Sequence, residues 1–147
     1  MTNRGYDELV NFVKSKNWKI FGTLTFKHNL TTEQAEKALN TFWNMMDRLL
    51  YGNLSWRKNK RIKRFCVLQK GNSNYNNHIH FVAKTVKGVT VKDLIEILTY
   101  IWHEKIKASG HHTIINEIGN VEATSKYLMH EFYKLGNDTI ATTSTNM

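Results

Sequence analysis

Two histidines separated by a single residue are the most chemically suggestive feature of this sequence. His78 and His80 flank Ile79 in a short apolar run that ends at Phe81. Because side chains alternate along a β-strand, both imidazoles would lie on one face, with Ile79 and Phe81 on the other. Two neutral imidazoles held side by side form half of a site for a divalent metal. The simpler alternative is that both are ordinary solvent-facing strand residues.

A third donor stands upstream of the histidines. Gln69 ends an apolar run nine residues before His78, and the residues between them are rich in Asn and include Gly71. A β-hairpin would therefore bring the Gln69 side-chain carbonyl beside the two imidazoles. Two nitrogens and one amide oxygen would make a small neutral site for Mg²⁺ or Mn²⁺, with positions left for water and phosphate. The sequence thus predicts metal ligands at His78, His80 and Gln69.

A tyrosine with polar neighbours occurs in the last predicted helix, residues 121–135. With 3.6 residues per turn, its apolar stripe consists of Val121, Leu128, Phe132 and Leu135. Tyr127 lies at the edge of that stripe, and His130, Glu131 and Lys134 follow it at i+3, i+4 and i+7. Tyr133 falls on the far side. Tyr127 is therefore a candidate nucleophile at a sheet–helix groove, and the alternative is a boundary tyrosine that only packs by its ring.

The charge of the chain favours a polyanionic partner. It carries 21 Lys plus Arg against 12 Asp plus Glu, a formal net charge of +9. Residues 56–64 begin with Trp56 and contain Arg57, Lys58, Lys60, Arg61, Lys63 and Arg64. We expect this stretch to bind nucleic acid through phosphate contacts, with Trp56 able to stack on a base. The alternative is a solvated loop that only aids solubility.

Periodicity and turn signals predict the elements that must position these residues. Helices are expected over residues 6–16, 31–52, 90–108 and 121–135, and strands over 20–26, 64–69, 78–84 and 111–118. The second helix begins at a capping pattern, Thr31 to Gln34, and its apolar pattern runs through Ala38, Phe42, Met45, Met46 and Leu49. The buried stripe of the third helix is expected to be Leu94, Ile97, Leu98, Ile101 and Trp102.

After the first helix, the predicted order is β-α-β-β-α-β-α. Helices alternate with strands, but the middle two strands form a hairpin. This order predicts an α+β fold of the ferredoxin-like, split βαβ type, with an extra N-terminal helix. Its antiparallel sheet would have helices on one face, which leaves the opposite face free to host a site.

Length and composition favour one folded domain. We assign residues 1–136 to that domain and residues 137–147 to a polar, flexible tail. The single cysteine, Cys66, excludes a disulfide framework and indicates a reducing compartment. No apolar run approaches the roughly 18 residues of a membrane span. We therefore expect no membrane partner and a cytoplasmic location, or a nuclear one if the host is eukaryotic.

Three segments together resemble the HUH endonuclease domain of rolling-circle replication initiators. Residues 21–26, Phe-Gly-Thr-Leu-Thr-Phe, are similar to motif I of that family. Gln69 with the His78-Ile79-His80 run is similar to motif II, and residues 125–131 are similar to motif III, the helix of the nucleophilic tyrosine. The resemblance covers roughly residues 18–135. Each motif is short, and the specificity of the resemblance lies in their order and spacing.

The resemblance implies a single-tyrosine enzyme that nicks and rejoins single-stranded DNA at an origin or hairpin. Tyr127 would attack the scissile phosphate, leaving a 5′-phosphotyrosine and a free 3′-hydroxyl that primes rolling-circle synthesis. A bound Mg²⁺ or Mn²⁺ would polarise the nonbridging oxygens. His130 and Lys134 would assist Tyr127, and replication proteins of a host or virus would be further partners.

The sequence departs from the family pattern at two positions. Gln69 stands where relatives commonly have Glu, so His28 and Glu117 stay open as alternatives for the third ligand. His130 stands where many relatives have Lys, and Lys134 is the nearest lysine on the matching side.

Two other functions also stay open. One is a single-tyrosine HUH transposase. The other is a non-enzymatic ferredoxin-like module that binds nucleic acid through sheet aromatics, for which Phe21, Phe26, Phe65 and Phe81 are available.

Overall fold

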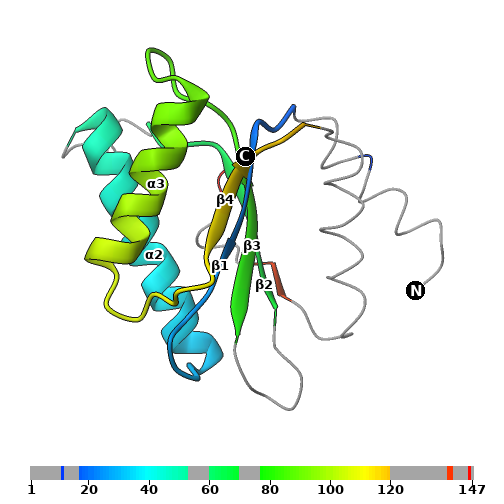
Figure 1. The fold of residues 1–147 in the computed structure, drawn as a ribbon, viewed down its shortest axis with the longest axis vertical. Helices are drawn as coiled ribbons and strands as arrows, with labels where there is room; N and C mark the ends of the chain where they lie inside the picture. Colours follow the sequence, from blue (N-terminus) through cyan, green and yellow to red (C-terminus); the bar gives the residue numbers. More distant parts are fainter. Residues whose placement is uncertain are drawn as a thin grey trace.

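The computed structural model of the protein describes residues 11, 17–52, 60–69, 77–119, 139–140 and 146. Five strands are described, β1 (Ile20–Leu24), β2 (Arg64–Gln69), β3 (His78–Ala83), β4 (Ile114–Glu117) and β5 (Thr139–Ile140). Two helices, α2 (Thr32–Tyr51) and α3 (Val91–Lys105), lie on the same side of the sheet (Figure 1).

The strands form one sheet in the order β4-β1-β3-β2-β5, and every neighbouring pair is antiparallel. The β1-α2-β2 unit straddles β3, and the β3-α3-β4 unit straddles β1. This is the split βαβ arrangement of a ferredoxin-like α+β fold, which confirms the prediction. The helices expected over residues 6–16 and 121–135 fall almost entirely outside the described residues.

The hydrophobic core lies between the sheet and the two helices. Strand side chains alternate, so Ile20, Leu24, Ile79 and Phe81 face the helices and are fully buried. Aromatic rings interlock there: Trp43 of α2 meets Phe81 edge-on with ring centroids 5.3 Å apart. Gly22 fits against the same Phe81 ring, where a Cβ would overlap it. The core thus fixes which face of β1 and β3 is left for chemistry.

The ends of α2 follow the predicted capping pattern. The Thr31 hydroxyl accepts from the Gln34 amide at 3.1 Å, and the Gln34 side chain accepts from the Thr31 amide at 3.0 Å. At the other end, Gly52 donates to the Arg48 carbonyl at 2.8 Å from a left-handed φ of 91°. No helix among the described residues is long and apolar enough to cross a membrane.

Two helices and one strand differ in detail from the prediction. The face of α2 that packs on the sheet is centred on Leu39, Trp43 and Met46, whereas Met45 and Leu49 are 36% and 58% exposed. The apolar arc of α2 is wider than the surface that the sheet covers, so the residues at its edge reach solvent. Helix α3 ends at Lys105 rather than near residue 108, and the fourth strand is shortened to Ile114–Glu117.

The face of the sheet away from α2 and α3 is less open than expected. Phe65, Val67 and Val82 point to this side, and all three are buried. His80 is only 3% exposed there, whereas His78 is partly exposed. The predicted free face is therefore buried along β2 and much of β3, and it stays open at the His78 end of β3 and along β4, where Ile114 and Asn116 are exposed.

Part of the segment predicted as a flexible tail, residues 137–147, is described. Thr139 and Ile140 form β5, which pairs with Leu68 and Val67 at the outer edge of β2. Asn146 also exchanges two backbone hydrogen bonds with Arg64, of 2.7 and 2.9 Å. At these three residues the chain follows the open edge of β2, whose backbone groups are available for pairing.

Candidate metal centre and adjoining pocket

The predicted metal ligands meet on the sheet face opposite the helices. Strand β3 lies between β1 and β2, so His80 has a paired residue on both sides, whereas the described pairing of His78 is with β2. Thr23 of β1 stands directly across from His80, and Gln69 of β2 stands directly across from His78. The β2–β3 hairpin thus brings Gln69 to the histidines as the sequence predicts.

Both ring nitrogens of His80 have a polar partner. Its Nε2 lies 2.6 Å from Gln69 Oε1, and its Nδ1 lies 3.1 Å from Thr23 Oγ1. The amide oxygen of Gln69 can only accept, so Nε2 of a neutral His80 carries the proton and donates to it, while Nδ1 accepts from the Thr23 hydroxyl. For Nε2 to bind a metal, the proton must instead be on Nδ1, from which the Thr23 hydroxyl can accept. Thr23 is therefore placed to partner either tautomer of His80.

His78 completes the cluster at the start of β3. Its ring lies 5.0 Å from the His80 ring, at an interplanar angle of 87°. The ring of Phe21 stacks on the far side of His80, with centroids 6.3 Å apart and planes 15° from parallel. Phe21, a half-buried residue of β1, thus limits the position of His80 from one side while His78 limits it from the other.

This donor set can hold a divalent cation through two imidazole nitrogens and one neutral amide oxygen. Among the described residues, no three histidine, cysteine, aspartate or glutamate side chains gather closely enough to hold a metal. A cation at this place would therefore depend on the amide oxygen of Gln69 as its third protein donor. The fit is compatible with the predicted site and leaves the remaining positions to water or phosphate.

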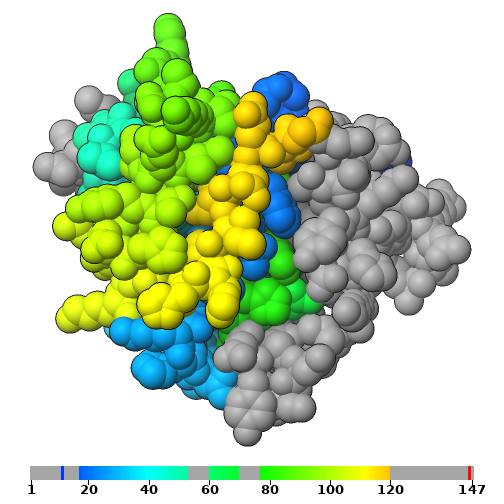
Figure 2. Space-filling view, in the orientation of Figure 1, coloured from blue at the N-terminus to red at the C-terminus, as the bar shows by residue number. Residues whose placement is uncertain are grey.

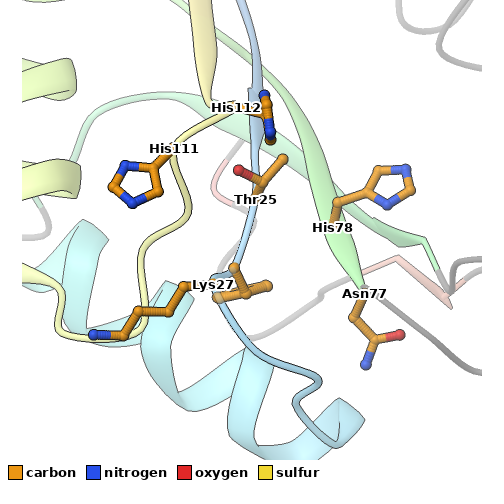
Figure 3. A pocket seen from close by; sticks show the side chains of 7 residues that line it. Thr25, Lys27, Asn77, His78, His111 and His112 are labelled. Atoms are coloured by element: carbon orange, nitrogen blue, oxygen red, sulfur yellow. The ribbon is translucent and has the colours of Figure 1, made fainter.

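A pocket of about 370 Å³ opens beside His78 (Figure 3). Its lining comes from three stretches: the end of β1, the start of β3, and the turn between α3 and β4. The side chains are Thr25, Phe26, Lys27, Asn77, His78, His111 and His112. The strand expected over residues 111–118 includes His111 and His112, so the sequence does not predict this pocket. Their adjacency, and the cation Lys27 just after β1, were the available signals.

The described part of the basic run lies at the other end of β2. Lys60, Arg61 and Lys63 are exposed and precede β2, whereas Gln69 ends it. A strand rises about 3.3 Å per residue, so the five steps from Arg64 to Gln69 span roughly 16 Å. These three cations are therefore accessible, but they do not touch the histidine cluster.

Arg64 does not fit the predicted role of a phosphate contact. Its side chain is buried, and Nη1 lies 3.1 and 3.0 Å from the two carboxylate oxygens of Asp47. Its guanidinium also lies over the Trp43 ring, 4.8 Å from the centroid. A cation that is desolvated and paired in this way is a structural residue, because an unpaired charge would be costly in the core.

The other predicted site residues can be placed only in part. Tyr127, His130 and Lys134 lie outside the described residues, as do Trp56, Arg57 and Lys58. Of the alternative third ligands, Glu117 pairs with Ile20, three residues along β1 from Thr23, and is therefore remote from His80. His28 is exposed in the segment after β1 and does not line the pocket beside His78.

Comparisons of the chain with protein-family models, with curated proteins and with solved structures found no match.

Proposed function

We propose that this protein is a metal-dependent endonuclease that nicks and rejoins single-stranded DNA through a covalent 5′-phosphotyrosine at Tyr127, and that it initiates rolling-circle replication. The substrate is an origin or hairpin strand, and the cation is Mg²⁺ or Mn²⁺. His78, His80 and Gln69 hold the cation. Exposed cations of the basic run, including Lys60, Arg61 and Lys63, contact the strand away from the site.

One observation carries this proposal: Gln69 Oε1 converges on His80 Nε2 at 2.6 Å beside the ring of His78. Both Gln69 and His80 are almost fully buried, and their mutual hydrogen bond offsets the cost of burying these polar atoms while it holds both donors in place. Three potential metal donors on a rigid hairpin are what a preorganised cation site requires. The predicted order of motifs, with the tyrosine helix following β4, adds support from the sequence.

The chemistry is an exchange of one phosphodiester for another. The Tyr127 oxygen attacks phosphorus and loses its proton, and the bond from phosphorus to the 3′-oxygen breaks. The 3′-oxygen leaves as a hydroxyl after taking up a proton, and the 5′-phosphate stays on the tyrosine. His130 is the candidate proton carrier, and Lys134 can offset negative charge in the transition state. A bound divalent cation supplies further positive charge to the nonbridging oxygens. Attack by a 3′-hydroxyl on the phosphotyrosine reverses the step and joins strands.

The non-enzymatic alternative receives less support from the sheet. A binding module of this type would present aromatic rings on the open face. Phe26 and Phe81 belong to the core beneath the helices, and Phe65 is only 3% exposed. Of the four candidate phenylalanines only Phe21 is partly exposed, and its ring is stacked on His80. These positions favour a site built around His80 over a stacking platform.

A covalent-adduct assay tests the proposal. The protein is incubated with labelled origin or hairpin strands and Mn²⁺, and the products are separated on a denaturing gel. We expect a slow-moving protein–DNA band that is lost in Tyr127→Phe and kept in the matched control Tyr133→Phe. The band should also require the metal ligands, and should be lost in His80→Ala. Loss in Tyr133→Phe alone would contradict the assignment of Tyr127, and no band under any condition would contradict the proposed activity.

A further inference from the structure

Two pockets meet beside the candidate metal centre. The pocket of about 370 Å³ next to His78 shares Lys27 and His111 with a second pocket of about 450 Å³. The second pocket is also lined by His103, Glu104, Ile106, Lys107 and Ser109. Together they hold two lysines and four of the seven histidines of the chain. Glu104 is the only carboxylate among their described lining residues, so the groove they form, here the β1-end groove, is cationic.

The turn between α3 and β4 is fixed to the end of β1. Gly110 donates to the Thr25 carbonyl at 2.7 Å, and Lys27 donates to the Ala108 carbonyl at 3.0 Å. At Gly110 a Cβ would lie 2.7 Å from Thr25 Oγ1 and 2.9 Å from the backbone carbon of Phe26, so only glycine allows this approach. In Figure 2 the atoms of this turn (yellow) lie directly against those that follow β1 (blue). The imidazoles of His111 and His112 are therefore carried by a rigid support.

Side-chain hydrogen bonds also fix the residues on both sides of the β1-end groove. Thr113 Oγ1 accepts from the Thr25 amide at 3.1 Å, and it lies 3.2 Å from Thr25 Oγ1. On the other side of the groove, Asn77 Nδ2 donates to the Leu30 carbonyl at 2.6 Å. A groove whose walls are tied in this way needs little reorganisation to bind a ligand, which favours affinity.

The β1-end groove meets the candidate metal centre at His78. Gln69 and His80 are 1% and 3% exposed, whereas the partly exposed His78 lines the groove itself. A phosphate bound at His78 would therefore lie at one end of the groove. Neighbouring phosphates of the same strand would then lie within reach of Lys27 and of the histidines on the α3–β4 turn.

We propose that the β1-end groove binds backbone phosphates of the substrate strand next to the scissile one, with Lys27, His111 and His112 as the main contacts. This inference rests on the proposed function and adds the path of the strand. The ammonium of Lys27 neutralises a phosphate, and imidazole N–H groups donate to phosphate oxygens. No described trio of histidine or acidic ligands gathers there, so the groove suits an anion better than a second metal. The groove extends over two adjoining pockets, which favours an extended strand over a single small anion.

Binding without metal tests this path independently of the chemistry. Fluorescence anisotropy with a labelled oligothymidylate, in EDTA and at several salt concentrations, gives the Kd and its salt slope. We expect Lys27→Ala to raise the Kd roughly fivefold and to lower the salt slope by about 0.7, the share of one single-strand phosphate. The double variant His111→Gln/His112→Gln should also weaken binding. Lys92→Ala, which removes an exposed lysine at the start of α3, is the matched control and should bind as the wild type.

The outcomes separate the strand path from the nicking activity. Equal Kd values and slopes for wild type, Lys27→Ala and the double histidine variant would overturn the groove, even if the covalent adduct forms. Selective loss in those variants would support it, even if no adduct forms. Thymidine monophosphate and inorganic phosphate serve as competitors. If either competes as well as the oligothymidylate, the groove takes a single phosphate and the strand path is wrong. Circular dichroism melts check that each variant is folded.

Discussion

Gln69 Oε1 and His80 Nε2 lie 2.6 Å apart across the β2–β3 hairpin. The two residues are not directly opposite each other: Gln69 pairs with His78, and Val67 pairs with His80. The contact is therefore diagonal, and the long glutamine side chain spans it along the strand direction. A substitution at position 69 acts directly on the ring nitrogen that would bind a cation.

Gln69→Glu should tighten Mn²⁺ binding by about tenfold, or about 1.4 kcal/mol, because a carboxylate adds charge to an otherwise neutral donor set. Without metal the same variant should melt at a lower temperature than the wild type, since it buries an anion. Saturating Mn²⁺ should reverse that loss. Titration calorimetry and thermal melts measure both effects. The control is Gln69→Leu, which fills similar space without a donor; wild-type affinity in that variant would exclude Gln69 as a ligand.

Thr23→Val should weaken Mn²⁺ binding by about 10-fold to 100-fold, although Thr23 is not itself a ligand. The change removes the hydroxyl 3.1 Å from His80 Nδ1 and keeps the side-chain shape. His80 then loses the hydroxyl that can accept from Nδ1–H in the tautomer that a metal on Nε2 requires. Thr23→Ser keeps the hydroxyl and should bind nearly as the wild type. If serine and valine variants have the same affinity in a calorimetric titration, the hydroxyl does not orient His80.

Asp47→Ala should lower the free energy of unfolding by about 3–5 kcal/mol, because it leaves the buried guanidinium of Arg64 without its carboxylate. Asp47 also accepts from the Ile62 amide at 2.9 Å, so the buried N–H of Ile62 would lose its acceptor as well. Urea denaturation measures the loss. Glu96→Ala, at an exposed position of α3, is the control and should change stability by less than about 0.5 kcal/mol. Similar losses in the two variants would mean that the ion pair is not structural.

Gly22→Ala should destabilise the fold by about 1–3 kcal/mol through overpacking. The added Cβ would overlap the Phe81 ring, whose Cζ atom would be 2.6 Å away. Phe81→Leu in the Gly22→Ala background should recover part of the loss, because the smaller side chain makes room. A urea-denaturation double-mutant cycle measures this coupling, with Phe81→Leu alone as the reference. Additive effects would show that the two residues do not compete for space.

Tyr51, at the end of α2, should titrate above the ordinary value of 10.0, since burial and then the nearby Asp47 carboxylate raise its pKa. The folded protein then holds this phenolic proton to higher pH than the unfolded chain. Its contribution to stability is complete below pH 10.0 and is lost as the pH rises further. Ultraviolet titration of the wild type against Tyr51→Phe isolates this group. Asp47→Asn should lower the pKa only in part, because burial is the larger cause.

The strand pattern was readable from the sequence because the period of two determined both the elements and their faces. Predicted strands at 64–69 and 78–84 match β2 and β3 to within one residue. The opposite faces of His80 and Phe81 follow from the same rule. Arg64 shows where the rule stops: alternation places it on the core side, but only the fold brings the Asp47 carboxylate of α2 beside it. A buried ion pair between distant segments leaves no local signal.

The candidate site could likewise be predicted only where its residues are joined by a local connection. Gln69 reaches the histidines through a hairpin, a local connection that turn residues in the sequence predict. Thr23 and the α3–β4 turn reach them through long-range pairing of β1 with β3 and β4. His111 and His112 were assigned to a strand because their neighbours are β-branched. The tight approach of Gly110 to Thr25 holds them in a turn instead.

The two residues of β5 have a consequence for how copies of this protein behave toward one another. By pairing with Val67 and Leu68, Thr139 and Ile140 occupy amide and carbonyl groups along the outer margin of β2. A truncation before residue 139 would leave that margin as a template on which a second molecule could align its own backbone. Such a protein would keep its core and yet tend to self-associate, so loss of these few residues would first be seen as aggregation rather than unfolding.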